Sequence, residues 1–220
     1  MLRLIDEDAR LRAAWGRATK EDHGDAAHDV EHLLRVALWT VRIGGAEVDP
    51  REAVAAALLH DVVNVPKDSP DRALASALCA EEARRVLAEA GFLADAVDRM
   101  AGAILDHSYS RGATPRSPLG RALQDADRLE ALGALGIMRT ISTGARMGSR
   151  YSHPSDPWAL GRPLDDVAFS VDHFFTKLLG LAATMCTETG RAEAARRTTH
   201  MRAFLSQLAD ELGAPLPETV

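Results

Sequence analysis

Cysteine and lysine are both scarce in this 220-residue chain. The two cysteines, Cys79 and Cys186, form no Cys-x-x-Cys motif, which argues against a disulfide framework and a zinc ribbon. Both are expected to be small buried hydrophobic residues. Only three of the 26 basic residues are lysines, so each lysine is a candidate for a specific role.

Long apolar runs and an excess of positive charge are also missing. The first ten residues carry charges where a signal peptide needs an unbroken apolar stretch, and no later run is long enough to span a membrane. The net charge of −6 argues against the broad basic face that binds duplex nucleic acid. We therefore expect a cytoplasmic protein with neither membrane nor duplex nucleic acid as partner. The sequence sets no limit on how many chains assemble, so an oligomer is allowed.

Alternating β-branched runs are essentially absent, whereas helical periodicity extends over most of the chain. This pattern predicts an all-α, single-domain helical bundle over residues 1–220, with a metal core at about 26–130 and closing helices at about 164–212. The expected helices are 2–18, 26–43, 50–61, 71–90, 94–108, 118–130, 134–147, 164–180 and 189–212. Residues 148–163 contain three prolines and two glycines, which predicts a long loop, either a binding element or a surface excursion.

Two polar residues, His60 and Asp61, directly follow five apolar residues on an expected helix. A buried carboxylate needs a cationic side chain or a metal ion as partner, so the pair is a candidate for metal binding. His32 and Asp127 lie on two other expected helices and are candidates to complete the site. The residues alone leave a ligand role and a structural role equally open.

Several segments of the sequence resemble the HD-domain superfamily of metal-dependent phosphohydrolases, whose motif is H…HD…D. The order His32, His60-Asp61, Asp127 matches this motif. The segments that carry the closer resemblance are His-Asp-Val-Glu-His-Leu-Leu-Arg-Val (28–36), Leu-Leu-His-Asp (58–61), Gln-Asp-Ala-Asp-Arg-Leu-Glu-Ala-Leu-Gly (124–133) and Asp-His-Phe-Phe-Thr-Lys-Leu-Leu (172–179). They are similar to one bacterial branch of HD hydrolases, some of whose relatives are deoxynucleoside triphosphate pyrophosphohydrolases.

The resemblance implies a metal site built from His32, His60, Asp61 and Asp127. Two imidazoles and two carboxylates suit Mn, Mg, Fe, Co or Ni, and four protein ligands leave two octahedral positions for water and a phosphoryl oxygen. Two-metal branches have two further histidines between the His-Asp pair and the last aspartate, whereas this chain has only His107 there. One divalent ion is therefore expected, and the same shortage disfavours an oxidative di-iron role.

Further residues are candidates for catalysis or substrate binding, each with a structural alternative. His107, Lys67 and Arg72 are expected to stabilise charge on the transferring or leaving group; the alternatives are a helix C-terminal histidine and solvated surface cations. The candidates for substrate contacts are His28, Lys177 and Tyr151, which otherwise belong to the surface or pin the long loop. Asn64 stands where some HD nucleotidases carry a water-activating glutamate, so that role is unassigned.

The expected activity is hydrolysis of a small phosphorylated substrate, a nucleoside or deoxynucleoside triphosphate, by attack of metal-activated water on phosphorus. The alternative is a non-catalytic protein that binds nucleotides, or whose helices the metal only staples together.

Overall fold

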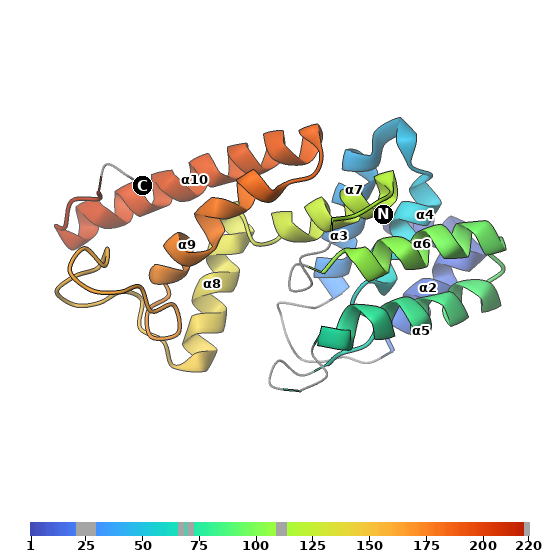
Figure 1. The fold of residues 1–220 in the computed structure, drawn as a ribbon, viewed down its shortest axis with the longest axis horizontal. Helices are drawn as coiled ribbons and strands as arrows, with labels where there is room; N and C mark the ends of the chain where they lie inside the picture. Colours follow the sequence, from blue (N-terminus) through green and yellow to red (C-terminus); the bar gives the residue numbers. More distant parts are fainter. Residues whose placement is uncertain (21–29, 66–68, 70–72, 109–113, 218–220) are drawn as a thin grey trace. The chain divides into compact units, whose positions relative to one another are not determined.

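The computed structural model describes residues 1–20, 30–65, 69, 73–108 and 114–217 (Figure 1). The described residues form helices, turns and one isolated bridge between Arg150 and Phe169, with no strand, so the predicted all-α class is confirmed. Backbone contacts divide the chain into two compact units, Met1–Asp127 and Arg128–Val220. Each unit is considered by itself, and the single domain expected over 1–220 stays a prediction. Within the described residues, no helix is long and apolar enough to cross a membrane.

The first unit carries most of the helices. They are α1 (Leu2–Glu7), α2 (Ala9–Ala18), α3 (Val30–Gly44), the 3₁₀ helix η1 (Gly45–Glu47), α4 (Pro50–Leu59), α5 (Ala75–Glu89), α6 (Ala94–Asp106) and most of α7 (Pro118–Leu129). The prediction of one helix over 2–18 is wrong at Asp8, where the backbone is extended and the carboxylate accepts a hydrogen bond from the Arg10 amide. Asp8 therefore caps a new helix.

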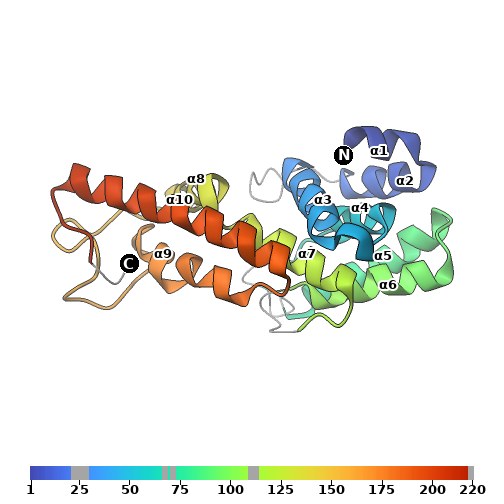
Figure 2. The same cartoon turned by 90° about the horizontal axis from the view of Figure 1, so that it is seen from above.

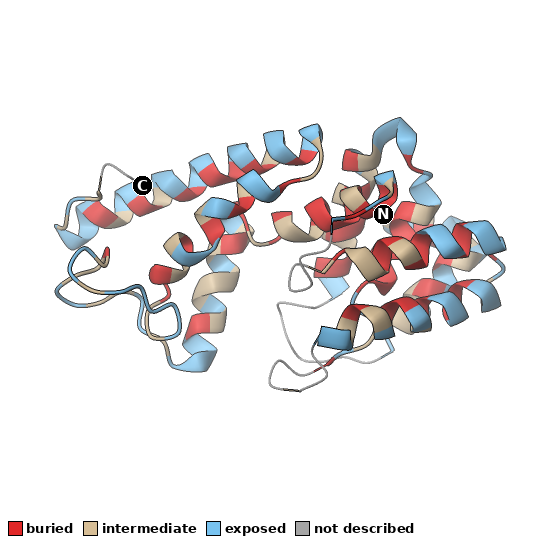
Figure 3. Ribbon diagram, in the orientation of Figure 1, coloured by how far each residue is buried: buried red, intermediate tan, exposed pale blue. Residues whose placement is uncertain are grey.

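Helix α4 is the centre of this unit. Its predicted start is confirmed, because the Asp49 carboxylate accepts from the amides of Arg51 and Glu52, and Pro50 occupies the first turn. Helices α2, α3, α5 and α6 all pack against α4 (Figure 2). All residues from Ala53 to Leu59 are buried as a result. Figure 3 colours the buried residues of the helices red and the exposed ones pale blue. The small alanines let neighbouring helices approach closely, and the helix delivers His60 into the interior.

The second unit contains α8 (Gly133–Met147), α9 (Asp172–Thr176), the 3₁₀ helix η4 (Leu178–Thr184) and α10 (Glu188–Leu212). Helix α10 packs against α8 and η4, and α9 packs against η4. The fully buried Phe174 stacks on Phe204, with ring centroids 6.0 Å apart. These contacts form the core of the second unit.

The helix expected over 164–180 is wrong. Residues 164–171 continue the long loop, and only Asp172–Thr176 is α-helical. The reason is local satisfaction of backbone donors: Asp165 accepts from the amides of Val167 and Ala168, and buried Asp172 accepts from the amide of Asp165. Side chains that bond nearby amides compete in this way with the helical hydrogen bonds.

The long loop predicted at 148–163 is confirmed as non-helical, and side chains fix it to its own unit. Arg162 donates through two nitrogens to Asp172, which is fully buried. The indole nitrogen of Trp158 donates to the carbonyl of Ala214 at 2.9 Å. These contacts pin the loop to the second unit at Trp158 and Arg162.

Candidate metal centre

His60 ends α4 with its ring fully buried. Its Nδ1 lies 2.7 Å from the carbonyl oxygen of Ala57. Because a carbonyl only accepts, Nδ1 must carry the proton and Nε2 must present its lone pair in the neutral ring. The buried Nε2 makes no hydrogen bond. Metal-binding histidines are commonly oriented by such a bond from the other ring nitrogen to a backbone carbonyl.

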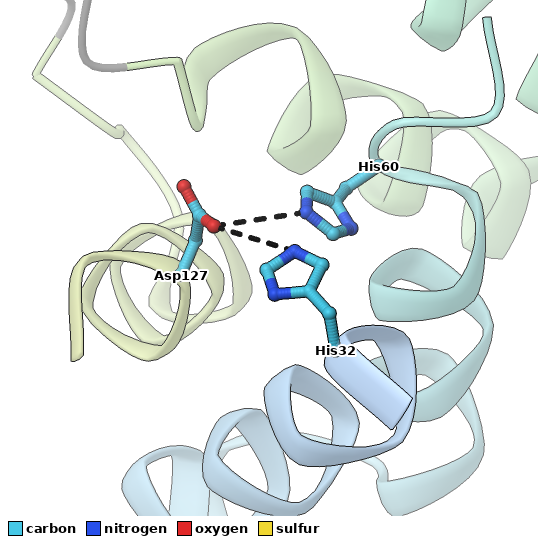
Figure 4. A group of neighbouring side chains, drawn as sticks. All are labelled: His32, His60 and Asp127. Carbon is cyan, nitrogen blue, oxygen red and sulfur yellow. Dashed lines mark ion pairs between the residues drawn. The ribbon is translucent and has the colours of Figure 1, made fainter. Parts of the chain in front are cut away.

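Side chains from two other helices converge on His60 (Figure 4). Asp127 of α7 places Oδ1 3.8 Å from Nε2 of His60 and 3.7 Å from Nε2 of His32, which lies on α3. Asp61 places Oδ2 3.4 Å from the same atom of His60. The structure therefore brings together His32, His60 and Asp127, and it groups Asp61 with His60 and His107.

These separations fit a shared ion better than direct bonds. Each is longer than a good hydrogen bond. Two ligand atoms that each lie about 2.1 Å from one ion are roughly 3.0–3.5 Å apart at octahedral or tetrahedral angles. The donor atoms of His32, His60 and Asp127 all lie within 4.8 Å of one another. A small adjustment of side chains would therefore place all of them around one divalent cation.

The electrostatics of this cluster also call for a positive charge. Burial by itself would lower the pKa of His60, but the carboxylates of Asp61 and Asp127 raise it to about 9. Burial would raise the pKa of both aspartates, and the neighbouring histidines instead hold it well below the usual range. The site thus keeps two negative carboxylates beside imidazole nitrogens, and a bound cation would take the place of the His60 proton.

His107 ends α6 in the way that His60 ends α4. Its Nδ1 donates to the carbonyl of Ile104 at 2.5 Å, so its Nε2 also faces inward. This Nε2 lies 3.7 Å from Oδ1 of Asp61, and the ring meets that of His60 edge to face with centroids 5.1 Å apart. Asp61 therefore has one oxygen toward His60 and the other toward His107. The structure places the predicted catalytic residue His107 beside the candidate metal ligands.

The other predicted site residues divide into two groups. His28, Lys67 and Arg72 lie outside the described residues. Lys177 and Tyr151 lie in the second unit, where both are exposed. Their roles in substrate binding stay predictions. Asn64, at the position where the resemblance would place a glutamate, is exposed.

The structure adds groups for which the sequence assigned no role. The backbone carbonyls of Ala57 and Ile104 orient the two imidazoles, and no side-chain pattern could reveal them. Gln124 is buried on α7 and donates from Nε2 to the carbonyl of Asp106 at 3.1 Å. The one signal in the sequence was its position three residues before Asp127, on the same side of the helix.

Comparisons with known proteins place this geometry in a family. Residues 29–132 match the HD domain, and this match includes all four candidate ligands and His107. The chain is also 33% identical over 204 residues to the uncharacterized protein YpgQ of Bacillus subtilis (strain 168), covering 90% of both chains. The chain belongs to the HD-domain superfamily.

Solved structures of similar proteins have the same fold. The crystal structure of selenomethionine YpgQ is 31% identical, with a TM-score of 0.71, over 92% of this chain and 97% of YpgQ. YpgQ has also been crystallised in complex with ADP, and that structure gives a TM-score of 0.68 at 28% identity over 96% of this chain and 98% of YpgQ. An HD-superfamily hydrolase from Bacillus thuringiensis gives 0.69 at 28% identity, covering 93% and 99% of the two chains. This HD protein is a metal-dependent phosphohydrolase.

Proposed function

We propose that this HD protein hydrolyses nucleotides at a phosphate group, using one divalent ion held by His32, His60, Asp61 and Asp127. The observation that carries the proposal is the fully buried Nε2 of His60, which makes no hydrogen bond and faces carboxylates from two parts of the chain. A buried polar atom without a hydrogen-bond partner or a ligand costs free energy. A cation satisfies it and offsets both carboxylates.

The mixed nitrogen and oxygen ligands suit Mn, Mg, Fe, Co or Ni. When bound, the ion supplies a Lewis acid that lowers the pKa of water and offsets negative charge on a phosphoryl oxygen. The two hydrogen bonds to backbone carbonyls hold the rings of His60 and His107 in one tautomer, so neither ring has to turn during the reaction.

His107 is the proposed group for proton exchange with the substrate. Its Nδ1 is committed to Ile104, so Nε2 is the atom that donates a proton to, or accepts one from, an oxygen near Asp61. Oδ1 of Asp61 lies 3.7 Å from this nitrogen, which places it beside the candidate metal ligands. Lys67 and Arg72, which follow the metal helix in the sequence, are the proposed cations for further phosphate oxygens.

The nucleotide as substrate class is supported by the likeness to YpgQ, which binds ADP in its crystal structure and matches nearly the whole of this chain. A diphosphate presents two groups that a divalent ion and nearby cations can hold together. Nucleoside and deoxynucleoside triphosphates, which the sequence predicts as substrates, contain the same pair of groups and stand first among the candidates.

The direct experiment is a screen of nucleoside mono-, di- and triphosphates with manganese, with products detected by mass spectrometry. We expect turnover of at least one triphosphate and its loss in Asp61→Ala. Asp98→Ala is the matched control, because Asp98 is an exposed carboxylate of α6 paired with Arg84, and it should leave the rate unchanged. The pair of products identifies the bond that is cut: monophosphate with pyrophosphate, or diphosphate with phosphate.

The proposal is wrong if no phosphate compound is hydrolysed, or if Asp61→Ala leaves turnover intact. A large loss of stability in chelator without hydrolysis would instead favour an ion that only staples the helices.

A further inference from the structure

A buried side-chain amide joins α7, which carries Asp127, to the end of α6, which carries His107. Gln124 is 1% exposed, and its Nε2 donates to the carbonyl oxygen of Asp106 at 3.1 Å. Asp106 is the last residue of α6 and directly precedes His107. The last four carbonyls of a helix have no partner within it, so Gln124 supplies one for this helix end.

The position of the His107 ring depends on this last turn. Two carbonyls of the turn have partners that matter for the ring: Ile104 accepts from Nδ1 of His107 itself, and Asp106 accepts from Gln124. If the turn frayed, the first bond would lose its geometry, and Nε2 would move from its place 3.7 Å from Asp61. A helix end held only by backbone bonds frays readily.

Gln124 also links α7 to the end of α6 through its hydrogen bond. It lies three residues before Asp127, on the same side of α7, so one helix face both meets the histidines and holds the end of α6. A displacement of about 1 Å at a reacting group can lower a rate by about a hundredfold. The Gln124 amide is thus placed to hold the His107 ring at a fixed position relative to the carboxylates of Asp61 and Asp127.

We propose that Gln124 is a positioning residue, which holds the last turn of α6 so that His107 presents Nε2 to the reacting phosphate. The inference rests on the proposed function for its effect on rate, but its effect on the ring is independent of any substrate. Metal binding is expected to change less than the rate, because the hydrogen bond from Gln124 ends at Asp106, which is not one of the four candidate ligands.

The test uses Gln124→Met, which preserves length and removes the donor. In the metal-free protein, long-range ¹H–¹⁵N spectra of the histidine rings should show His107 with a protonated Nδ1 in the wild type and a mixture of tautomers in the variant. His107→Gln assigns the signals. If Gln124→Met does not fold, Gln124→Asn, whose amide is one methylene shorter, is expected to give the same result.

The matched control is Thr40→Val. Thr40 is equally buried in the same unit and donates to the carbonyl of Val36, away from His107. This variant also loses a buried side-chain donor, but one whose bond lies within α3, so it should leave the His107 spectrum unchanged. If Thr40→Val alters the ring in the same way, the effect is general loosening and the inference is wrong.

Kinetics with the best nucleotide provide the second readout. Gln124→Met should lower kcat by about 10- to 100-fold with KM and manganese affinity within about twofold of the wild type. In a His107→Gln background it should lower kcat by less than about twofold, because its effect passes through that ring. The inference is wrong if the losses in kcat of the two single variants multiply in the double variant, or if the tautomer of His107 is unchanged in Gln124→Met. If no nucleotide is hydrolysed, the proposed function fails, and the metal-free spectra still decide the role of Gln124.

Discussion

At the scale of single residues, His60 and His107 use the same arrangement twice. Each is the first residue after a helix, and each donates from Nδ1 to the carbonyl three residues earlier. The backbone therefore selects the tautomer, and the opposite nitrogen of each ring is left for the site. This arrangement explains how two rings from different helices are held ready without a network of polar side chains.

Among the four candidate ligands, substitution of Asp127 should weaken metal binding most, because one of its oxygens faces both His32 and His60. We expect Asp127→Ala to weaken manganese binding by about 100-fold or more, a loss typical of removing a group that a metal site depends on. Isothermal titration calorimetry measures it directly. Asp98→Ala is the control, and an affinity equal to wild type in Asp127→Ala would remove this residue from the ligand set.

The sequence predicted these ligands because an H…HD…D order can be read without coordinates, and because polar residues after an apolar run are anomalous in themselves. It did not predict the ring orientations, which depend on backbone carbonyls. Nor did the sequence decide whether His107 lies beside the candidate ligands or only ends a helix. Both descriptions proved true of the same residue.

At the scale of elements, glycines in helices show which contacts are close. A Cβ added to Gly136 in α8 would lie 2.3 Å from the carbonyl oxygen of Ala131, whereas a Cβ added to Gly102 in α6 would meet nothing within 4 Å. We expect Gly136→Ala to lower the free energy of unfolding by about 1–3 kcal/mol through overpacking. Gly102→Ala should raise it by about 0.5–1 kcal/mol through helix propensity.

Urea denaturation of the two alanine variants measures both effects. Equal stabilities of the two variants would contradict the close approach of Ala131 to α8.

Glu82 of α5 joins that helix to α2 through Arg17, at 2.6 Å. Hydrogen bonds from Arg85 and Arg17 outweigh burial and lower its pKa from 4.5 to about 2. The carboxylate therefore stabilises the fold above pH 4.5, and this contribution is lost as the pH falls toward 2. Since the pair is partly exposed, we expect Glu82→Gln to cost only about 1 kcal/mol at pH 7.

The measurement is the free energy of unfolding in urea between pH 7 and the lowest pH at which the chain folds. The difference between wild type and Glu82→Gln should shrink below pH 4.5. Glu81→Gln, on the exposed neighbouring position, is the control. A difference that is constant with pH would show that Glu82 acts through packing rather than charge.

The helices were predictable where apolar periodicity and caps agree, as in α4 after Asp49 and Pro50, and in α10. The prediction was wrong over 164–171, where helical periodicity is present but Asp165 and Asp172 take the backbone amides. It also merged α1 with α2, because Asp8 fits a helix interior as a polar surface residue and gives no sign that it is a cap. Side chains that bond the local backbone decided each case.

At the scale of the whole molecule, an ion that binds only the folded chain should stabilise it. Manganese at about 100 times its Kd should raise the free energy of unfolding by roughly 2.7 kcal/mol. Calorimetry should therefore show a higher Tm with manganese, reversed by chelator, and no change in Asp127→Ala. An equal rise in that variant would place the stabilising ion elsewhere on the molecule.

Anomalous diffraction from crystals grown with manganese shows whether His32, His60, Asp61 and Asp127 hold one ion. We predict one strong peak at the manganese edge among Nε2 of His32, Nε2 of His60 and the carboxylates of Asp61 and Asp127, with bonds of about 2.0–2.3 Å. The absence of a peak among these atoms in crystals that bind manganese at another position would contradict the account.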